Sequence, residues 1–296
     1  MSTLHPPSAS SVSLVILTRD KADYTRRCLE SLRGITYRPL EIILVDNGSA
    51  DDTPDLLRSF QQQAGSAGIT VQVQFNPINV GAATGRNQGI QLASGDFFAF
   101  LDNDVVVRSR SWIPRLIAEF QARPETGAVC PKLIFPFEPF LIQYAGLVVS
   151  PTGRVDYLGR GKPRTHPDFN ERRELQATIS ACMMVPSAVV QKVGPFDEQF
   201  NPVQFEDVDY SYRIRAIGRR IVYLPSVEMY HFENVTTGLI QPGVGLKRQT
   251  IVNGMKFKRK WRDVFSKEGG PPDSTMHWEE LPHRPLSGIG ELETVT

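Results

Sequence analysis

Residues 96–104 read DFFAFLDND, an apolar run followed at once by polar residues. A short, continuous apolar run of this kind is typical of a buried strand, which would end close to Leu101. Asp102, Asn103 and Asp104 would then lie just beyond the carboxyl end of that strand. Ligands bind at this edge in open parallel α/β sheets, so the stretch indicates a functional site if parallel strands flank it.

Three upstream segments have the same character. Residues 12–17 (VSLVIL) and 41–45 (EIILV) predict buried strands, and residues 71–75 (VQVQF) alternate apolar and polar side chains as a half-buried strand does. Helical patterns separate these strands over residues 21–33, residues 52–60 and the stretch after Gly81. This alternation predicts an α/β fold with a mostly parallel central sheet flanked by helices.

The second half of the chain is less regular. Residues 128–150 mix prolines with short apolar runs, which indicates small strands and loops. Residues 181–185 and 220–224 predict strands, and residues 206–217 and 249–261 predict helices. We therefore expect a small, mainly β region beside the central sheet.

The composition excludes several classes of protein. Apolar residues make up 41% and charged residues 22% of the 296 residues, which is ordinary for a soluble globular chain. Lys and Arg number 33 against 32 Asp and Glu, so the net charge of +1 provides no basic field for nucleic acid, and we expect no nucleic-acid partner. No apolar run approaches the roughly 18 residues of a membrane-spanning helix.

The N-terminus and the cysteines predict a cytoplasmic location. The first residues, MSTLHPPSASS, are polar and proline-bearing, and they predict no signal peptide. Cys28, Cys130 and Cys182 are far apart and lack the CxxC spacing of a zinc or dithiol site. An odd, sparse set suits a reducing compartment better than a disulfide framework.

The Asp102-Asn103-Asp104 motif is the strongest local signal. Two carboxylates one residue apart can hold Mg²⁺ or Mn²⁺, because these hard cations prefer oxygen ligands and keep waters that a substrate phosphate can replace. An acidic turn is the alternative, since Asp and Asn favour turns. The position of the motif after a buried strand favours the metal site.

Two further loops follow predicted strands. Asp46 and Asn47 can pair with a nucleobase edge while Gly48 lets the backbone approach closely, and an Asn-Gly turn is the alternative. Arg86 lies in a glycine-bearing stretch that leads into a helix, where it can hold a diphosphate. The stretch is not a GxxxxGK[ST] phosphate loop, so ATP hydrolysis of that type is not indicated.

Carboxylates also cluster at Glu206, Asp207 and Asp209. Crowding of like charges raises a carboxyl pKa, which suits a general base, and an acidic helix N-terminus is the alternative. His231 follows an apolar and aromatic run. It is either a structural histidine or a metal ligand, depending on whether the fold brings it back to Asp104.

Taken together, five fragments resemble the family 2 glycosyltransferases, which are inverting enzymes of the GT-A fold. In chain order they are VSLVILTRDKADYTRRCLESL, EIILVDNGSADDT, NVGAATGRNQGI, FFAFLDNDVVV and PFDEQFNPVQFEDVDYSYRIRAIG. The sequence is most similar to the rhamnosyltransferase-like bacterial branch of that family. The resemblance extends from residue 12 to about residue 231 and leaves the rest of the chain without a counterpart.

The resemblance implies a role for each motif. Thr18, Asp46 and Asn47 match positions that contact the base and ribose of a nucleotide, and Arg86 matches a position near the donor sugar or diphosphate. The metal motif is matched by Asp102, Asn103 and Asp104, with Asp104 as the more direct ligand and Asn103 within the donor site. His231 matches a second metal ligand of parts of the family.

The resemblance also implies the catalytic residues. Asp207 matches the catalytic base, and Glu206 is its neighbour. The first loop departs from the family pattern, because Arg19 and Asp20 stand where an Asn or a similar residue is common. We therefore expect Arg19 and Asp20 to bind the donor in a different way.

The implied reaction is the inverting transfer of a sugar from a UDP- or dTDP-sugar to an acceptor hydroxyl, with Mn²⁺ or Mg²⁺ as cofactor. The implied setting is bacterial glycan or glycoconjugate biosynthesis, such as that of cell wall or polysaccharide. We expect a GT-A domain at residues 12–265, in which residues 12–110 form the nucleotide-sugar half and residues 111–265 the acceptor half. Residues 1–11 would form a flexible N-terminus and residues 266–296 a C-terminal tail.

The acceptor is predicted only by class, as a glycan, a lipid-linked molecule or a small molecule. Residues 181–184 (ACMM) either line its pocket or form a core strand. Residues 247–262 carry seven basic and no acidic residues. They either seat the protein peripherally on anionic lipid at the inner face of the membrane or form a solvated helix face.

Two other functions are compatible with these patterns. One is a catalytically silent sugar-nucleotide-binding or docking module, against which the retention of both acidic motifs counts. The other is a nucleotidyltransferase of related architecture, but SLVILTRDKAD lacks the glycine-rich activation motif that such an enzyme needs.

Overall fold

The computed structural model describes residues 9–66, 68–233, 235, 245–281 and 284–296. Most of the N-terminus predicted to be flexible, residues 1–8, therefore lies outside the described residues. Of the basic stretch at residues 247–262, the side chain of Lys247 also lies outside them.

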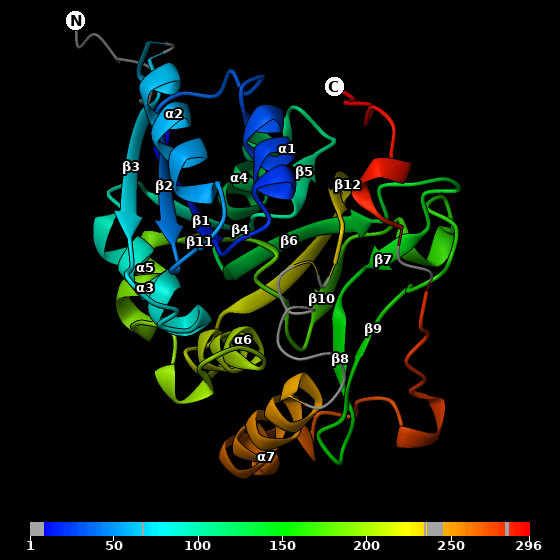
Figure 1. Cartoon of the computed structure of the whole chain (residues 1–296). Coiled ribbons are helices and arrows are strands. Elements are labelled where there is room, and N and C mark those ends of the chain that lie inside the picture. The colour runs from blue at the N-terminus through cyan, green and yellow to red at the C-terminus, as the bar shows by residue number, and fades with distance from the viewer. Residues whose placement is uncertain (1–8, 67, 234, 236–244, 282–283) are drawn as a thin grey trace, which may run out of the picture.

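Strands and helices alternate along the chain, as Figure 1 shows. The first half contains β1 (Val12–Thr18), α1 (Ala22–Leu32), β2 (Leu40–Asp46), α2 (Thr53–Ser66), β3 (Thr70–Phe75), α3 (Ala82–Leu92), β4 (Phe97–Asp102), β5 (Val105–Val107) and α4 (Trp112–Ala122). The second half contains β6 (Thr126–Ile134), β7 (Ile142–Tyr144), β8 (Leu147–Val149), β9 (Val155–Tyr157), β10 (Arg173–Leu175), β11 (Cys182–Pro186), α5 (Ser187–Val193), α6 (Glu206–Ala216), β12 (Arg220–His231) and α7 (Gly245–Phe265). Each strand and helix predicted within residues 12–101 is present.

The central sheet confirms the predicted fold class. Ten strands form it in the order β10-β12-β6-β11-β4-β1-β2-β3, with β5 paired to β12 and β7 paired to β6. β3, β2, β1 and β4 run parallel, whereas β11 is antiparallel to its neighbours β4 and β6. Thr18 lies opposite Asp46, and Leu17 lies opposite Asp102. Parallel pairing thus brings three of the predicted loops to one edge of the sheet.

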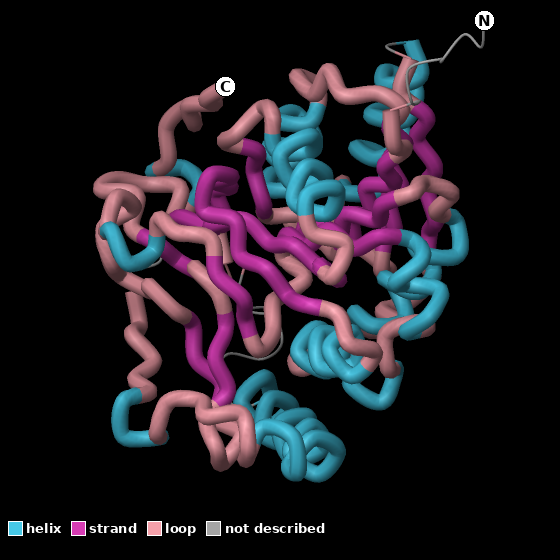
Figure 2. Tube along the Cα trace, turned by 180° about the vertical axis from the view of Figure 1, so that it is seen from behind, coloured by secondary structure: helices cyan, strands magenta, loops and turns pink. Residues whose placement is uncertain are grey.

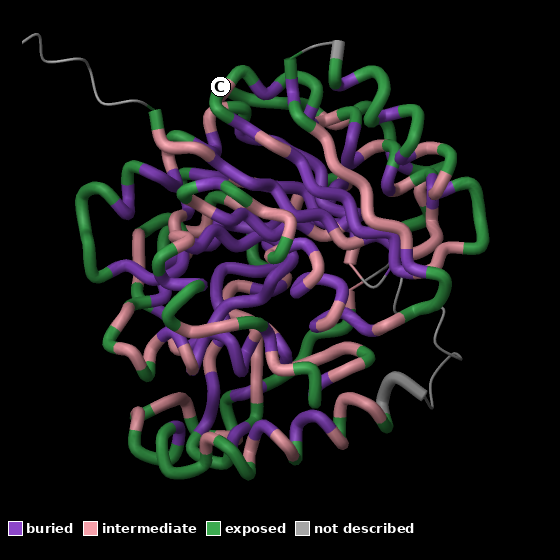
Figure 3. The backbone as a smooth tube through the Cα atoms, turned by 90° about the vertical axis from the view of Figure 1, so that its left-hand side faces the viewer, coloured by how far each residue is buried: buried purple, intermediate pink, exposed green. Residues whose placement is uncertain are grey.

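Helices cover both faces of this sheet (Figures 1 and 2). α1, α2 and α4 lie on one face, and α3, α5 and α6 lie on the other. α3 approaches β1 closely because it carries Gly85 and Gly89, where an added Cβ would lie 2.4 Å from Leu17 and 2.3 Å from Val15. Figure 3 shows the buried residues concentrated in the sheet between these layers, as the continuous apolar runs of the strands predict.

Residues 128–150 contain the expected small strands, β7 and β8, and the loops around them, but they begin within a longer strand. Residues 126–134 form β6, a buried nine-residue strand between β12 and β11. Pro131 fits into β6 because the pairing is irregular on both sides. On one side its partner Leu224 in β12 is the last residue before a shift in register, and on the other side β11 pairs with β6 only at Val129. Pro131 therefore lies in an irregular strand, whereas Pro136 and Pro139 lie in the loop between β6 and β7.

The strand predicted at residues 220–224 is longer than expected. β12 has 12 residues and ends at His231. It runs parallel to β6 and antiparallel to β5, so that His231 lies opposite Val105. This pairing brings the end of β12 beside the loop that follows β4.

β8 and β9 form a separate two-stranded sheet beside α7, in agreement with the small β region that was predicted. After α7 the chain crosses back, and residues 284–296 return to β5. Val295 pairs there with Ser109 in a parallel bridge. Within the described ranges, every helix is either too short or too polar to span a bilayer.

Candidate functional site

The carboxyl ends of β1, β2 and β4 form one side of a cleft of about 900 Å³. The predicted site residues that line it are Thr18, Arg19, Asn47, Arg86, Asp102, Asn103, Asp104, Glu206, Asp207 and His231. Asp20 and Asp46 do not line it, and their carboxylates accept hydrogen bonds from the backbone N–H groups of Ala50 and Ser49. The fold thus gathers most of the predicted residues, from both halves of the chain, around one space.

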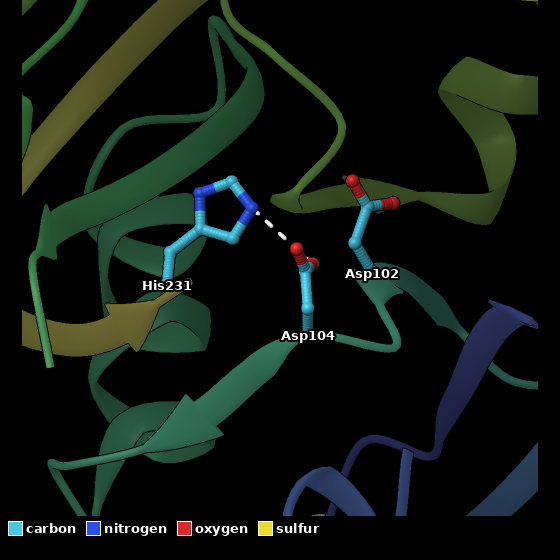
Figure 4. A group of neighbouring side chains, drawn as sticks. All are labelled: Asp102, Asp104 and His231. Atoms are coloured by element: carbon cyan, nitrogen blue, oxygen red, sulfur yellow. Dashed lines mark ion pairs between the residues drawn. The ribbon is translucent and has the colours of Figure 1, made fainter. Parts of the chain in front are cut away.

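Asp102, Asp104 and His231 form a group whose candidate ligand atoms all lie within 4.8 Å of one another. His231 Nε2 is 3.3 Å from Asp104 Oδ1. Figure 4 shows these two side chains pointing toward one another, with the Asp102 carboxylate beside them. The contact follows from the pairing of β12 with β5, so His231 does return to Asp104.

Gln143 determines which nitrogen of His231 faces the group. Gln143 Nε2 donates to the carboxylate of Glu233 at 2.9 Å, so its other amide atom, Oε1, is the one 3.0 Å from His231 Nδ1. An amide oxygen accepts, and Nδ1 therefore carries a proton. This leaves Nε2 as the nitrogen that a cation would use.

The charge on His231 is coupled to Asp104. Burial lowers the pKa of His231, but the carboxylate of Asp104 outweighs this effect and raises the pKa above its ordinary value of 6.5. Metal ligands must lose their protons to bind. A cation would therefore take the place of the proton on His231 Nε2. Its other ligands would be the carboxylate oxygens of Asp102 and Asp104, which already lie close by.

Arg86 joins this group to α6. Its guanidinium donates to Asp102 Oδ1 at 2.8 Å and to Glu206 Oε1 at 2.9 Å. The side chains of Arg86 and Glu206 are only 7% and 4% exposed, so removing Arg86 would leave the buried carboxylate of Glu206 without this partner. Burial and the charge of Asp207 raise the pKa of Glu206, while Arg86 opposes the shift. Contact of Arg86 with a donor diphosphate stays a prediction.

Asp207 is held by backbone N–H groups and remains partly exposed to the cleft. Its Oδ2 accepts from Ser180 N at 3.2 Å, and its Oδ1 accepts from Val208 N at 2.8 Å. Burial raises the pKa of Asp207, although Arg86 and both N–H groups lower it. A carboxylate that is oriented, accessible and raised in pKa has the properties of a general base.

The turn before α6 is strained. Gln204 and Phe205 have φ values of 83° and 72°, which are uncommon for residues other than glycine. Asn253 of α7 is fully buried and donates to the carbonyl oxygens of Val203 and Gln204 at 2.9 and 3.0 Å. α7 therefore supports the turn that presents Glu206 and Asp207, and strained turns of this kind cluster at functional sites.

Asn47 holds a neighbouring loop. Its Nδ2 donates to Asn79 Oδ1 at 2.8 Å and to Gly81 O at 3.2 Å, and its Oδ1 accepts from Val80 N at 2.9 Å. The close approach expected at Gly48 is made by the chain itself, since an added Cβ would lie 2.5 Å from the backbone of Ile78. The contact of Asn47 with a nucleotide stays a prediction.

Of residues 181–184, those in β11 belong to the core. Cys182, Met183 and Met184 are at most 2% exposed within the central sheet. Ala181 lines the cleft. The core-strand interpretation therefore applies to three of the four residues.

A comparison with models of protein families identifies the relationship. The model described as glycosyl transferase family 2 matches residues 13–196, more than half of the 296-residue chain. The chain belongs to glycosyl transferase family 2. The family predicted from the five sequence fragments is thereby confirmed.

Several curated proteins are similar to this family 2 chain. It is 32% identical to "Uncharacterized protein y4gI" of Sinorhizobium fredii over 85% of its length, and 31% identical to the O-antigen biosynthesis protein RfbC of Myxococcus xanthus over 76%. It spans only 27% and 17% of those two proteins. The N-acetylglucosaminyl-diphospho-decaprenol L-rhamnosyltransferase of Mycobacterium tuberculosis is 28% identical over 76% of this chain and 77% of its own length.

Solved structures share the fold. The structure of GalNAc-T7 with UDP, GalNAc and Mn²⁺ matches with a TM-score of 0.67 at 18% identity, covering 86% of this chain and 50% of that one. The mannosyltransferase PcManGT from Pyrobaculum calidifontis, in complex with GDP-Man and Mn²⁺, matches with a TM-score of 0.61 at 15% identity, covering 88% and 69%. These likenesses confirm the GT-A fold for this family 2 chain.

Three site residues of this family 2 chain had no signal in the sequence. Gln143 orients His231, Ser180 donates its N–H to Asp207, and Asn253 supports the turn before α6. Each lies on a segment distant in sequence from the group it contacts, and none belongs to a motif. Sequence patterns indicate the charged groups of a site more readily than the neutral ones that orient them.

Proposed function

We propose that this chain is an inverting glycosyltransferase that transfers a sugar from a UDP- or dTDP-sugar to an acceptor hydroxyl in bacterial glycan or glycoconjugate biosynthesis. One observation carries the proposal: the Asp102, Asp104 and His231 group lines the same cleft as Asp207. A site for a diphosphate leaving group and a general base are the two parts that such a transfer needs.

The donor would bind on the side of the cleft formed by β1, β2 and β4. Thr18, Arg19 and Asn47 line this side and suit the nucleotide. Asp20 and Asp46 would contribute indirectly, by holding the loop at residues 49–50 through its backbone N–H groups. Asp102, Asp104 and His231 would hold Mn²⁺ or Mg²⁺, which when bound neutralises the charge that develops on the leaving diphosphate. The imidazole nitrogen makes Mn²⁺ the better fit, because magnesium prefers an all-oxygen set.

Asp207 is the proposed catalytic residue on the other side of the cleft. Its carboxylate takes the proton from the acceptor hydroxyl as that oxygen forms a bond to the anomeric carbon. The bond from the anomeric carbon to the diphosphate oxygen breaks on the opposite face, and the configuration inverts. Glu206, the neighbour of Asp207, is buried and paired with Arg86, so it holds the start of α6 in place rather than acting on the substrate.

The acceptor side extends to α7. The name of the Mycobacterium tuberculosis relative supports a rhamnosyltransferase-like activity on a lipid-linked acceptor. Ile251 and Met255 of α7 line the cleft and are 63% and 57% exposed. We propose that the basic stretch at residues 247–262 seats the protein on anionic lipid at the inner face of the cytoplasmic membrane, with the cleft open to that surface.

Two substitutions test the proposed function. Nucleotide binding is measured by calorimetry with UDP, dTDP, GDP and ADP, each with and without Mn²⁺, and turnover as nucleotide release in the presence of a bacterial lipid extract. Asp207→Asn should lower turnover by about 100- to 10,000-fold and leave nucleotide binding near the wild-type value. Asp104→Ala should lose the Mn²⁺-dependent binding. Asp168→Asn, an exposed carboxylate away from the cleft lining, is the matched control.

Other outcomes would revise the proposal. Full turnover in Asp207→Asn would remove this residue from the role of base. Nucleotide binding that needs no metal, combined with no turnover in the wild type, would favour the non-catalytic docking module instead.

A further inference from the structure

Trp278 lines the cleft from the C-terminal tail, outside residues 13–196 that match the family model. The residue is 50% exposed, although tryptophan is highly buried on average in folded proteins. None of the roles proposed above uses it. A large aromatic group that remains exposed inside a cleft is a candidate for ligand contact.

The exposed ring is nevertheless fixed in place. The ring of Tyr157, in β9, lies 5.2 Å from that of Trp278 at an interplanar angle of 66°. The guanidinium of Arg160 lies 4.3 Å from the centre of the indole. Arg160 also donates to the backbone oxygen of Glu279, the next residue along the chain, at 2.7 Å. The side chain is therefore held from two directions while half of its surface stays free.

The same contacts connect Trp278 to the metal group. Arg160 donates to both carboxylate oxygens of Glu233 at 2.9 Å. Glu233 in turn accepts from Gln143, whose other amide atom contacts His231. A continuous series of buried or half-buried polar contacts thus runs from the indole to His231. The ring has a defined position relative to the reacting groups, as a substrate-positioning residue requires.

We propose that Trp278 is the platform on which a sugar ring of the acceptor stacks. This inference rests on the proposed function and names the class of its acceptor: a glycan or glycoside, rather than a bare alcohol or a protein hydroxyl. The C–H groups of a pyranose form an apolar face, and its hydroxyls lie around the rim. A rigid, flat indole offers a large apolar area to such a face at a low cost in conformational entropy, and the rim hydroxyls can then be directed toward Asp207.

The test measures acceptor binding and turnover separately. Methyl pyranosides of glucose, N-acetylglucosamine, mannose and rhamnose are titrated against the protein with Mn²⁺ and UDP or dTDP, and binding is followed by ligand-observed NMR. We expect at least one pyranoside to bind. Trp278→Ala should weaken that binding on the order of tenfold or more, and Trp278→Phe should retain most of it. Val264→Ala, an exposed apolar residue of α7 away from the cleft lining, should have no effect.

Nucleotide release from the donor provides the second measurement. With the same pyranoside as acceptor, Trp278→Ala should raise the half-saturating concentration of the pyranoside by a similar factor. The half-saturating concentration of the donor should stay unchanged. The midpoint of thermal unfolding confirms that the variants are folded.

The outcomes separate this inference from the proposed function. Pyranoside binding that is equal in wild type and Trp278→Ala, or absent in the wild type, overturns the inference, whether or not turnover occurs. Stimulation of release by octanol or a serine peptide but by no pyranoside overturns it as well. Pyranoside binding that depends on Trp278, without any turnover, would leave this site standing and contradict the proposed transferase activity.

Discussion

At the scale of single residues, Gln143 has the clearest influence on the proposed metal site. It orients His231 through Nδ1 and is itself fixed by Glu233. Gln143→Leu keeps the approximate volume but removes the acceptor for Nδ1, so the imidazole loses its orientation. Loss of such an outer contact typically lowers metal affinity by about 10- to 100-fold, and we expect this for Mn²⁺ measured by calorimetry.

The control for that substitution lies at the other side of the sheet. Among the residues that the structure describes, Gln74 in β3 donates only to the backbone oxygen of its neighbour Phe75, so Gln74→Leu should leave Mn²⁺ affinity unchanged. Unchanged Mn²⁺ affinity in Gln143→Leu would show that His231 needs no orienting partner, or that it does not bind the metal.

Sequence patterns predicted the charged residues of this site better than their partners. Asp102, Asp104 and Asp207 were found because each belongs to a short motif beside an apolar segment. The ion pairs of Arg86 could not be found in this way, because Arg86 and Glu206 are 120 residues apart. Their contact depends on how α3 and α6 pack, which no local pattern encodes.

At the scale of elements, the C-terminal segment at residues 284–296 ties together the two strands that flank the metal group. Arg110 N donates to Val295 O, and Val295 N donates to Arg108 O, both at 2.7 Å. The hydroxyl of Tyr230, the residue before His231, donates to Glu293 O at 3.1 Å. The segment thus contacts both the end of β5, which follows Asp104, and the end of β12, which carries His231.

We predict that weakening this segment reduces both stability and Mn²⁺ affinity. Ile289 is 6% exposed and belongs to an apolar cluster with Tyr230 and Phe232. Ile289→Ala should destabilise the fold by about 2 kcal/mol and lower Mn²⁺ affinity, measured by denaturant unfolding and calorimetry. Glu291→Gln, an exposed change in the same segment, is the control. A loss of stability with unchanged Mn²⁺ affinity would limit the segment to a structural role.

The regular elements of the first half could be predicted because their periodicity is strong. Nearly continuous apolar runs mark the buried strands of a parallel sheet, and a polar turn and a helix follow each of β1, β2 and β3. The sequence predicted only small strands where β6 lies, since Pro131 in a strand pattern argues against a long central strand. α4 has no counterpart among the expected elements, although Trp112, Ile113, Leu116, Ile117 and Phe120 are buried at helical spacing and provide a signal for it.

At the scale of the whole molecule, the cleft is built from two parts of the chain. The family model covers β4, which ends at Asp102, and the turn that carries Asp104, but it ends at residue 196. Asp207, His231 and Trp278 come from later segments and reach the same cleft. The carboxylates at the end of β4 therefore depend on the second part of the chain for the proposed base and for the third ligand.

The orientation of the whole molecule on a membrane can be tested through α7. Ile251 and Met255 are exposed at the cleft. Three exposed arginines follow the same helical spacing: Arg248 lies three residues before Ile251, Arg259 four residues after Met255, and Arg262 three residues after Arg259. Residues at this spacing share one face of a helix. Phe257 and Phe265 of the same helix are buried, so the exposed face is free to meet a surface.

We expect the protein to sediment with phosphatidylglycerol vesicles but not with neutral phosphatidylcholine vesicles. A basic residue near an anionic surface contributes about 1 kcal/mol, so the triple change of Arg248, Arg259 and Arg262 to Gln should weaken binding roughly a hundredfold. Ile251→Ser combined with Met255→Ser should weaken it through loss of apolar burial. Ile78→Ser, which alters an apolar residue outside α7 that is 68% exposed, should not weaken it.

Equal binding to neutral vesicles, or no effect of either set of α7 variants, would contradict the proposed orientation. Unchanged nucleotide binding in all of the variants would show that a loss of vesicle binding comes from the surface and not from the site.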